Sequence, residues 1–376
     1  MKDIMGLIYT GENDARLREL TQVRAVAALP VAGRYRVIDF PVSSMVNTGI
    51  RNVAVITQKN YHSLMDHLGS GKEWDLHGKN NRLSILPPFL TRENVGVYTG
   101  LVDALQSNAN FLRRCRQEYV ILTTSHFIIN TDFRAMMRFH VEKYADITLL
   151  YTDDPAMRRV TQGSESSFCT TDANGRIVGL EIDPITPTRE HTIIEACLLK
   201  RELLLHLVDQ AAANGQHEFM RGVLQPLIND SILHVYGYEH KGRAWRIESV
   251  QDYFRFNMDL LDSRVRGELF SRGYPVYTKL RDDMPTRYVG EAAVSNSLVA
   301  DGCVIEGTVV NSVVFRGVRV AKGAVVRNSV VMQDAEVEAD AELDCCILDK
   351  QAVVRGKGRL IGPPAYPIVI AKGVVI

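Results

Sequence analysis

The sequence of 376 residues has no excess of charge of either sign and no long run of apolar residues. Forty-four Lys and Arg residues balance 44 Asp and Glu residues, so no global field draws the chain to nucleic acid or to an anionic membrane. No stretch reaches the roughly 18 apolar residues of a membrane span, and the first residues lack the basic and apolar segments of a signal peptide. We therefore expect a cytoplasmic protein with neither nucleic acid nor a membrane as a partner.

The chain also lacks the short motifs of several enzyme classes. Its six cysteines include no Cys-x-x-Cys pair and are interpreted as ordinary thiols. Its ten histidines form no HxH or HExxH group, which argues against a metal site. No GxSxG indicates acyl chemistry, and no GxxxxGK[ST] indicates a phosphate loop. With 46% hydrophobic and 23% charged residues the composition is that of a folded globular protein, and the length favours two domains.

The first 260 residues alternate between short β-branched runs and segments of helical period, which predicts an α/β domain. The expected strands are Ile4–Tyr9, Val53–Thr57, Tyr119–Thr123 and Ile147–Tyr151. The expected helices are Val42–Thr48, Tyr61–Leu68, Val102–Arg113 and Phe133–Tyr144. The connections suit right-handed crossovers, so we expect a doubly wound, mainly parallel sheet. Ligands of such sheets bind beyond the carboxyl ends of the strands, which directs attention to the loops after Tyr9 and Leu122.

From about residue 292 the helical period disappears and aliphatic residues recur every six positions. The sets are Leu298, Val304 and Val310; Val314, Val320, Val326 and Met332; Val325, Val331, Val337 and Leu343; and Leu348, Val354 and Leu360. This repeat predicts a parallel β-helix with each aliphatic pointing inward, and sandwich strands of unrelated spacing are the alternative. The expected domains are residues 1–261, a linker at 262–291 with Pro275 and Pro285, and the β-helix at 292–376.

An ordered set of motifs carries a specific resemblance. Gly11-Glu12-Asn13-Asp14-Ala15-Arg16 follows the first strand, and then come GRYRVIDF at 33–40, ITQ at 56–58, ILPP at 85–88 and the hexapeptide repeat. Over nearly the whole chain this set resembles the bacterial ADP-glucose pyrophosphorylase (glucose-1-phosphate adenylyltransferase) family. The resemblance implies a Rossmann-like nucleotidyltransferase domain followed by a left-handed parallel β-helix. Enzymes of that family join ATP and glucose 1-phosphate to give ADP-glucose and pyrophosphate for glycogen synthesis.

The phosphate-binding loop departs from the family pattern. Catalytic members share a GGxGxRL loop, whose glycines let backbone N–H groups approach the triphosphate. Here Gly11 and Arg16 persist, while Glu12 and Asp14 replace two glycines. Each carboxylate repels a phosphate by about 1 kcal/mol at ~4 Å in water, and by more in a drier site. We interpret this segment as a solvated loop that no longer binds ATP.

Four further charged positions of the family are neutral or reversed. Val26 replaces a lysine near the phosphates, and Asp183 replaces the lysine that holds the glucose phosphate. Ser125 and Ile247 replace the two aspartates that bind Mg²⁺. Because the ion needs hard oxygen ligands and must neutralise charge on the transferred phosphorus, the resemblance implies that this chain has no catalytic residues, metal site or cofactor.

Compensating residues are the alternative to this interpretation. Glu248, Asp132 or Asp14 would have to replace the lost metal ligands. Arg24 either reaches the phosphates in place of the missing lysine or lies on the surface as an ordinary arginine, which we expect.

Other residues keep the family pattern and would line a vestigial nucleotide and sugar pocket. They are Gly11, Arg16, Gln58, Tyr98, Gly100, Asp103 and Glu181. Ordinary roles as turn residues, caps or surface groups are the alternative for these. Arg34 and Arg36 correspond to residues that line an effector site in the family, so a phosphorylated effector is one interpretation and solvated ion pairs are the other.

The losses fall on charged site residues, while the scaffold motifs remain intact. In some Gram-positive bacteria the enzyme has a catalytic subunit and a related, non-catalytic second subunit of the D type, and this chain resembles the latter. The resemblance implies a regulatory subunit, inactive alone, that forms a heterotetramer with a Mg²⁺-dependent catalytic subunit, with self-association as a further option. A slow adenylyltransferase and a sugar-phosphate-binding or effector-binding protein are the alternatives.

Overall fold

The computed structural model describes residues 2–79, 81–88, 98–160 and 164–376. Contacts group the chain into two compact units. The sheet unit comprises Met1–Glu12, Phe40–Arg246 and Arg272–Tyr277, and the coil unit comprises Asn13–Asp39, Ile247–Ser271 and Thr278–Ile376. Each unit is therefore assembled from segments that are far apart in the sequence.

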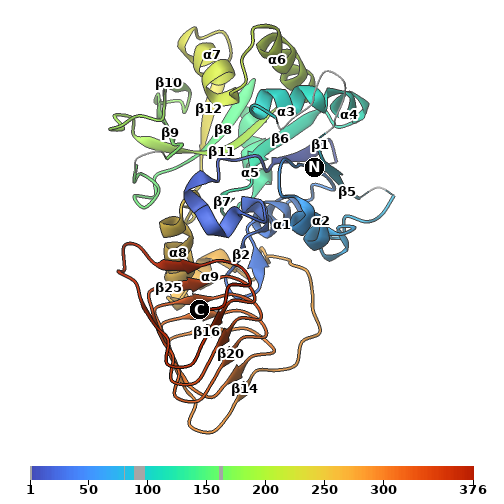
Figure 1. The fold of residues 1–376 in the computed structure, drawn as a ribbon. Coiled ribbons are helices and arrows are strands. Elements are labelled where there is room, and N and C mark those ends of the chain that lie inside the picture. The colour runs from blue at the N-terminus through green and yellow to red at the C-terminus, as the bar shows by residue number, and fades with distance from the viewer. Residues whose placement is uncertain (1, 80, 89–97, 161–163) are drawn as a thin grey trace. The chain divides into compact units, whose positions relative to one another are not determined.

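The sheet unit contains a mixed, mainly parallel sheet (Figure 1). Its parallel strands are, in order, β5 (Arg82–Leu86), β4 (Asn52–Ile56), β1 (Ile4–Tyr9) and β6 (Tyr119–Thr124). β11 (His191–Lys200) then runs antiparallel to its neighbours β6, β8 (Ile147–Thr152) and β9 (Ser167–Thr171). β10 (Ile177–Ile182) extends the sheet beyond β9, and β12 (Val235–Glu239) pairs in parallel with β8. The predicted α/β class and the four predicted strands are confirmed.

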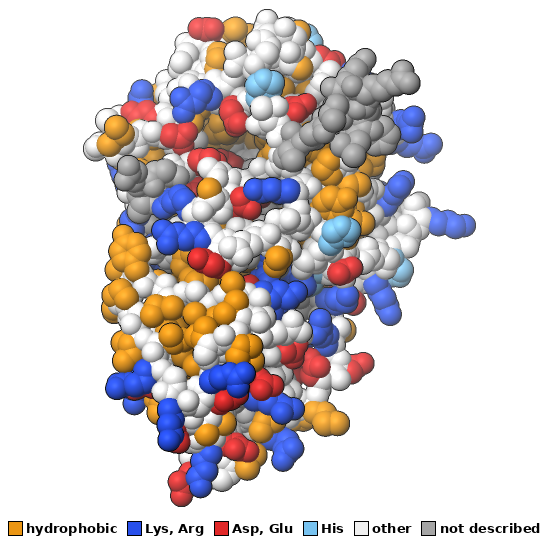
Figure 2. Space-filling view, in the orientation of Figure 1, with side chains coloured by type: hydrophobic (Ala, Val, Ile, Leu, Met, Phe, Trp, Pro, Cys, Tyr) orange, Lys and Arg blue, Asp and Glu red, His pale blue; other side chains and the backbone are white. Residues whose placement is uncertain are grey.

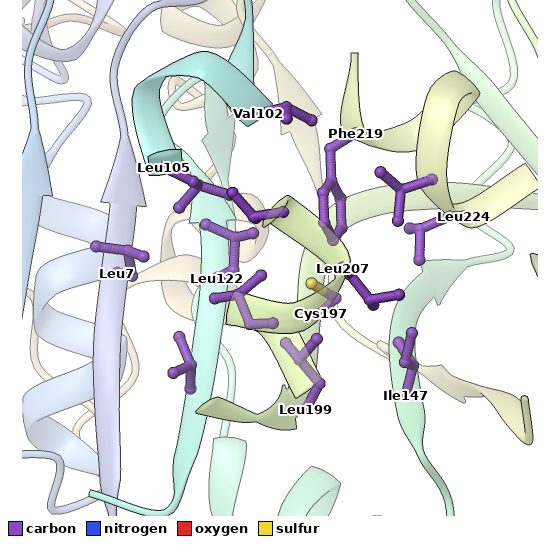
Figure 3. Close-up of a cluster of buried hydrophobic side chains, with 14 of the residues drawn as sticks. Leu7, Val102, Leu105, Leu122, Ile147, Cys197, Leu199, Leu207, Phe219 and Leu224 are labelled. Atoms are coloured by element: carbon purple, nitrogen blue, oxygen red, sulfur yellow. The ribbon is translucent and has the colours of Figure 1, made fainter. Parts of the chain in front are cut away.

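Helices pack against this sheet through a large apolar cluster. Figure 3 shows Val102, Leu105, Leu207 and Phe219 beside Leu122 of β6. The helices that contribute to this cluster are α3 (Leu101–Ser107), α4 (Ala109–Arg114), α6 (Arg201–Ala213) and α7 (Gln225–Asn229), and the unit also contains α1 (Asp39–Asn47), α2 (His62–Leu68) and α5 (Phe133–Glu142). The shorter elements are 3₁₀ helix η3 (Lys72–Trp74), π-helix η4 (Met220–Leu224), and strands β7 (Phe127–Ile128) and β13 (Trp245–Arg246). In the described ranges, no helix has the length and apolarity needed to cross a membrane.

One predicted helix is broken in two. The period predicts a single helix over Val102–Arg113, but the chain forms α3 and α4 on either side of Asn108. The Asn108 side-chain amide donates to the Ala104 carbonyl at 2.8 Å. This bond competes with the regular backbone ladder, which is the usual reason that asparagine interrupts a helix.

The coil unit contains three parallel sheets of five short strands each, as a parallel β-helix requires. The first sheet is β14 (Arg287–Tyr288), β17 (Val304–Ile305), β20 (Arg319–Val320), β23 (Glu336–Val337) and β26 (Val353–Val354). The second is β15 (Ala293–Ser295), β18 (Thr308–Val310), β21 (Val325–Arg327), β24 (Glu342–Asp344) and β27 (Arg359–Ile361). The third is β16 (Leu298–Val299), β19 (Val313–Val314), β22 (Val330–Val331), β25 (Cys346–Leu348) and β28 (Ile368–Ile370).

The spacing of the inward positions differs from the predicted strict period of six. Val309 stacks on Val326, then on Leu343 and Leu360, so one coil takes 17 residues. Each coil between Val309 and Leu360 therefore contains one five-residue step, whereas the preceding coil, from Val294 to Val309, takes 15 residues. As a result Val304 and Val310 are only partly buried, while their neighbours Ile305 and Val309 fill the core. The prediction that Leu298, Val304, Val310 and Val325 point inward is wrong for this reason.

Two segments from outside the repeats complete the coil unit. Residues 13–39 contribute η1 (Ala15–Thr21), η2 (Val26–Ala28), β2 (Pro30–Val31) and β3 (Tyr35–Arg36), and the other segment contributes α8 (Val250–Asp259) and α9 (Ser263–Leu269). The Tyr253 hydroxyl of α8 donates to the Pro30 carbonyl at 2.7 Å, and the Ala32 N–H donates to the Asn257 side chain at 3.0 Å. These bonds join α8 to the β2–β3 hairpin.

Candidate functional site

One candidate site lies within the sheet unit, at the carboxyl ends of β1 and β6, where Tyr9 is the register partner of Thr124. One oxygen of Glu12 accepts hydrogen bonds from the Ser125 backbone N–H at 2.5 Å and from the Ser125 hydroxyl at 2.6 Å. The Glu12 side chain is only 6% exposed, and its Oε1 lies 3.7 Å from Nδ1 of His126. The prediction that Glu12 belongs to a solvated loop is therefore wrong, because Ser125 supplies donors that draw the carboxylate inward.

Further carboxylates surround this contact. The register of β11 jumps between Ile194 and Cys197, and Glu195 lies in the resulting irregularity. Burial raises the pKa of Glu195, His126 opposes the shift, and Glu165 and Glu12 add to it. Burial also raises the pKa of Glu218, with a contribution from Glu165. A phosphate group entering this region would meet several acids in a poorly hydrated setting, so the geometry disfavours anions.

Glu195→Gln is expected to stabilise the protein at neutral pH. The folded-state pKa of Glu195 lies above its ordinary value of 4.5, so the folded protein holds this proton more tightly than the unfolded chain does. Stability is then lost as the pH rises above about 4.5, and a neutral glutamine removes that loss. Urea unfolding between pH 5 and pH 8 should show a gain that shrinks as the pH falls, with the exposed Glu142→Gln as the control. A gain independent of pH would contradict this assignment.

The retained pocket residues contact other parts of the same unit. The Gln58 side-chain amide donates to the Tyr98 carbonyl at 2.6 Å. A Cβ on Gly11 would overlap the Tyr9 hydroxyl and the Gln58 side chain, and a Cβ on Gly100 would overlap the carbonyl of residue 217. Both glycines therefore leave room for the protein's own groups.

Asp103 and the sugar-side acids also have structural partners. Asp103 accepts a hydrogen bond from the Thr99 N–H at 3.0 Å. Glu181 accepts from the Thr188 N–H at 2.9 Å and from the Thr188 hydroxyl. Asp183 forms an ion pair with Arg221 at 2.9 Å, so its charge is partly neutralised. At each of these positions the side chain therefore has a specific contact within the protein, as expected for an ordinary structural role.

Two of the residues considered as compensating metal ligands, Asp132 and Glu248, each lie close to an arginine of their own unit. Asp132 caps α5 and pairs with Arg134 at 2.9 Å in the sheet unit. In the coil unit, Glu248 lies 3.8 Å from Arg16, and Ile247 is buried. Throughout the described ranges, no group of three or more His, Cys, Asp or Glu side chains is arranged to hold a metal ion. Val26, at the family lysine position, is buried in η2.

A separate candidate site, a cation cluster, lies entirely within the coil unit. Arg24 is buried and pairs with the fully buried Asp349 at 2.8 Å. The expectation that Arg24 is a surface arginine is therefore wrong, since a buried carboxylate 325 positions away holds it. Burial, together with Arg36 and Arg24, lowers the pKa of Lys350 to about 7, while Asp349 opposes the shift. More cations than anions meet here, which is the charge balance of an anion site.

Arg34 lies near another buried cation of the coil unit, Arg316. Arg34 is exposed, and its guanidinium lies 5.8 Å from the centre of the Tyr35 ring. Arg316 is buried, and its guanidinium lies 3.6 Å from the Asp283 carboxylate. Burial lowers the pKa of Arg316, and the positive charge of Arg34 lowers it further. Sequence reasoning found Arg34 and Arg36 but missed Lys350, Asp349 and Arg316, because these follow β-helix strands and the hexapeptide period does not mark them.

Comparison with known proteins identifies the family. A Nucleotidyl transferase family profile matches residues 5–263, and a profile described as GlmU-like, C-terminal hexapeptide matches residues 284–364. The glycogen biosynthesis protein GlgD of Bacillus subtilis (strain 168) is 32% identical over 375 residues, which cover 99% of this chain and 96% of that protein. Glucose-1-phosphate adenylyltransferase of Geobacillus stearothermophilus is 32% identical over 329 residues, 87% of this chain and 84% of that protein. The chain belongs to the glucose-1-phosphate adenylyltransferase family.

Membership in this family confirms the predicted succession of a nucleotidyltransferase domain and hexapeptide coils. It places the chain in the ADP-glucose pyrophosphorylase family of glycogen biosynthesis. The enzyme of Clostridium novyi (strain NT), also named glucose-1-phosphate adenylyltransferase, is 29% identical over 86% of this chain and 84% of its own length. Because relatives with both kinds of name are about equally similar, identity alone does not separate a regulatory member of the family from a catalytic one.

Proposed function

We propose that this chain is a regulatory, catalytically inactive subunit of glucose-1-phosphate adenylyltransferase. The observation that carries the proposal is the contact between Glu12 and Ser125. It places a buried carboxylate in the loop that approaches the triphosphate in catalytic members. In the same contact, the residue at a metal-ligand position of the family donates its N–H and O–H to that carboxylate. A site arranged in this way repels the nucleotide and offers no carboxylate to Mg²⁺ at residue 125.

The cation cluster supports a role in regulation. Arg24 is a buried cation, and burial together with the positive field of Arg36, Arg24 and Arg281 lowers the pKa of Lys350 to about 7. Burying like charges together is costly unless an anion compensates for them. We propose that a phosphorylated effector binds here, in preference to the alternative of solvated ion pairs.

An exposed apolar surface on the coil unit supports association with another subunit. Figure 2 shows hydrophobic side chains gathered over the lower part of the view, where Figure 1 has the coils. On the coil that contains β26, β27 and β28, and on the residues that follow it, the exposed apolar side chains are Ile361, Tyr366, Val374, Val375 and Ile376. Exposed patches of this kind mark interaction sites. We propose that this surface contacts a catalytic subunit in a heterotetramer, and an interface that favours one partner state by ~1–3 kcal/mol would change its affinity 5- to 150-fold.

Mixing the chain with its catalytic partner tests the proposed function. The purified chain alone is expected to form no ADP-glucose from ATP, glucose 1-phosphate and Mg²⁺. Added to a catalytic family member from the same organism, it should change that enzyme's rate or effector response, and the two should co-elute at the mass of a mixed oligomer. A rate for the isolated chain close to that of the catalytic member would instead establish the alternative, an adenylyltransferase in its own right.

A further inference from the structure

The Glu12–Ser125 contact has the chemistry of an anion bound in a cradle. Two donors of one residue, a backbone N–H and a hydroxyl, converge on a single carboxylate oxygen at 2.5 and 2.6 Å. Ser125 itself is fully buried, and it follows β6 at the edge of the sheet where ligands of such folds bind. Donors fixed by the backbone in this way suit any oxyanion, whether a carboxylate or a phosphate oxygen.

The Glu12 carboxylate belongs to the same chain as Ser125, so its effective concentration at the Ser125 donors is high. The Glu12 side chain is about nine-tenths buried, and among the residues that the structure describes none forms a hydrogen bond with its second oxygen, Oε2. If Glu12 served only to stabilise the local structure, both oxygens of its carboxylate would be expected to accept hydrogen bonds. The arrangement instead has one oxygen held by two donors, while the charge of Glu12 contributes to raising the pKa of the neighbouring Glu195.

We infer that Glu12 acts as an internal anion that occupies an oxyanion cradle at Ser125 and thereby excludes the phosphate groups of nucleotides. This inference rests on the proposed function and deepens it, because it assigns the exclusion to one residue rather than to the sum of the lost catalytic groups. The excluded ligand class is the polyphosphate anion, as in ATP or inorganic pyrophosphate. An incoming phosphate oxygen cannot share the cradle, because two anions would then meet beside the same donors.

Removing the internal anion should open the cradle. Glu12→Ala is expected to bind ATP at least tenfold more tightly than the unaltered chain, measured by isothermal titration without added metal, and pyrophosphate should behave likewise. Glu12→Gln should gain less, because its amide oxygen still accepts from the Ser125 N–H. The exposed Glu142→Gln, which removes the same charge elsewhere in the sheet unit, should leave both affinities unchanged. Equal ATP affinities for Glu12→Ala and the unaltered chain would overturn the inference.

Hydrogen exchange provides a second readout that does not depend on affinity. The Ser125 amide should be protected in the unaltered chain, exchange faster in Glu12→Ala, and regain protection when pyrophosphate is added. Exchange that stays slow in a folded Glu12→Ala protein would show that another group holds this amide, and would overturn the inference.

Turnover separates this inference from the proposed function. Glu12→Ala should bind ATP yet form no ADP-glucose, because Ser125 and Ile247 still occupy the metal-ligand positions of the family. If the inference fails, Glu12→Ala binds ATP no more tightly than the unaltered chain, and its Ser125 amide exchanges no faster. Failure of the proposed function shows in ADP-glucose formation by the unaltered chain, whatever the variant does.

Discussion

Replacing Asp349 by asparagine is expected to lower the free energy of unfolding by about 3–5 kcal/mol, the usual effect of removing one partner from a buried ion pair. Asp349 is fully buried and pairs with the buried Arg24 at 2.8 Å. It also opposes the positive field of Arg24, Arg36 and Arg281 at Lys350. Asparagine keeps the shape of the side chain but leaves the cations without their counter-charge, and the fold must bear that repulsion.

Urea unfolding of the coil unit measures this effect. Asp282→Asn, at an exposed position of the same unit, is the matched control and should cost less than about 0.5 kcal/mol. Arg24→Met combined with Asp349→Leu should cost less than Asp349→Asn alone, because no unpaired charge remains buried. A cost below about 1 kcal/mol for Asp349→Asn would show that water or movement of the arginine compensates for the lost charge.

Lys350→Met is expected to act with opposite signs on stability and on anion binding. The pKa of Lys350 falls from 10.5 to about 7 because of burial and the neighbouring arginines. The folded protein therefore binds this proton less tightly than the unfolded chain, and its stability rises with pH between about 7 and 10.5. Methionine fills similar space without charge, so the free variant should gain more than about 1.4 kcal/mol at pH 7, the equivalent of one pKa unit. That gain should decline as the pH rises.

Sulfate serves as the probe of anion binding because it keeps its charge over this range. Lys350→Met should bind sulfate at least tenfold more weakly than the unaltered chain. In the unaltered chain a bound anion favours protonated Lys350, so binding should weaken above pH 7 by a factor approaching ten per pH unit. Lys322→Met, exposed in the same unit, should change neither property. Sulfate binding that is unaffected by both the substitution and the pH would place the anion site away from Lys350.

The fold was largely predictable from the sequence because its strands are short, β-branched and regularly spaced. Ile4–Tyr9 and Ile147–Tyr151 needed no tertiary information to be identified as strands. The period of six in the repeats came close to the true coil but could not reveal the five-residue step, since that step is set by the stacking of Val309, Val326 and Leu343. The local sequence pattern therefore predicts the β-helix, whereas the register of its inward residues depends on how the coils stack.

The candidate site was predictable only in part. Substitutions at Glu12 and Ser125 were visible as separate departures from the family pattern, but no sequence rule joins residues 113 positions apart into one hydrogen-bonded contact. For Arg24 the local sequence carried no sign of burial, since an arginine is usually exposed. Its partner Asp349 determines its position. Long-range polar contacts of this kind lie outside what composition and periodicity encode.

The pairing of Arg24 with Asp349 also bears on how the chain is made. A ribosome releases residues 13–39 early, yet the buried carboxylate that neutralises Arg24 emerges 325 residues later. Residues 13–39 therefore cannot reach their final packing, and Arg24 stays solvated, until nearly all of the coils have been synthesised. Contacts of such long sequence separation slow folding, so assembly of the coil unit is expected to be post-translational and to be the stage at which chaperones act on this protein.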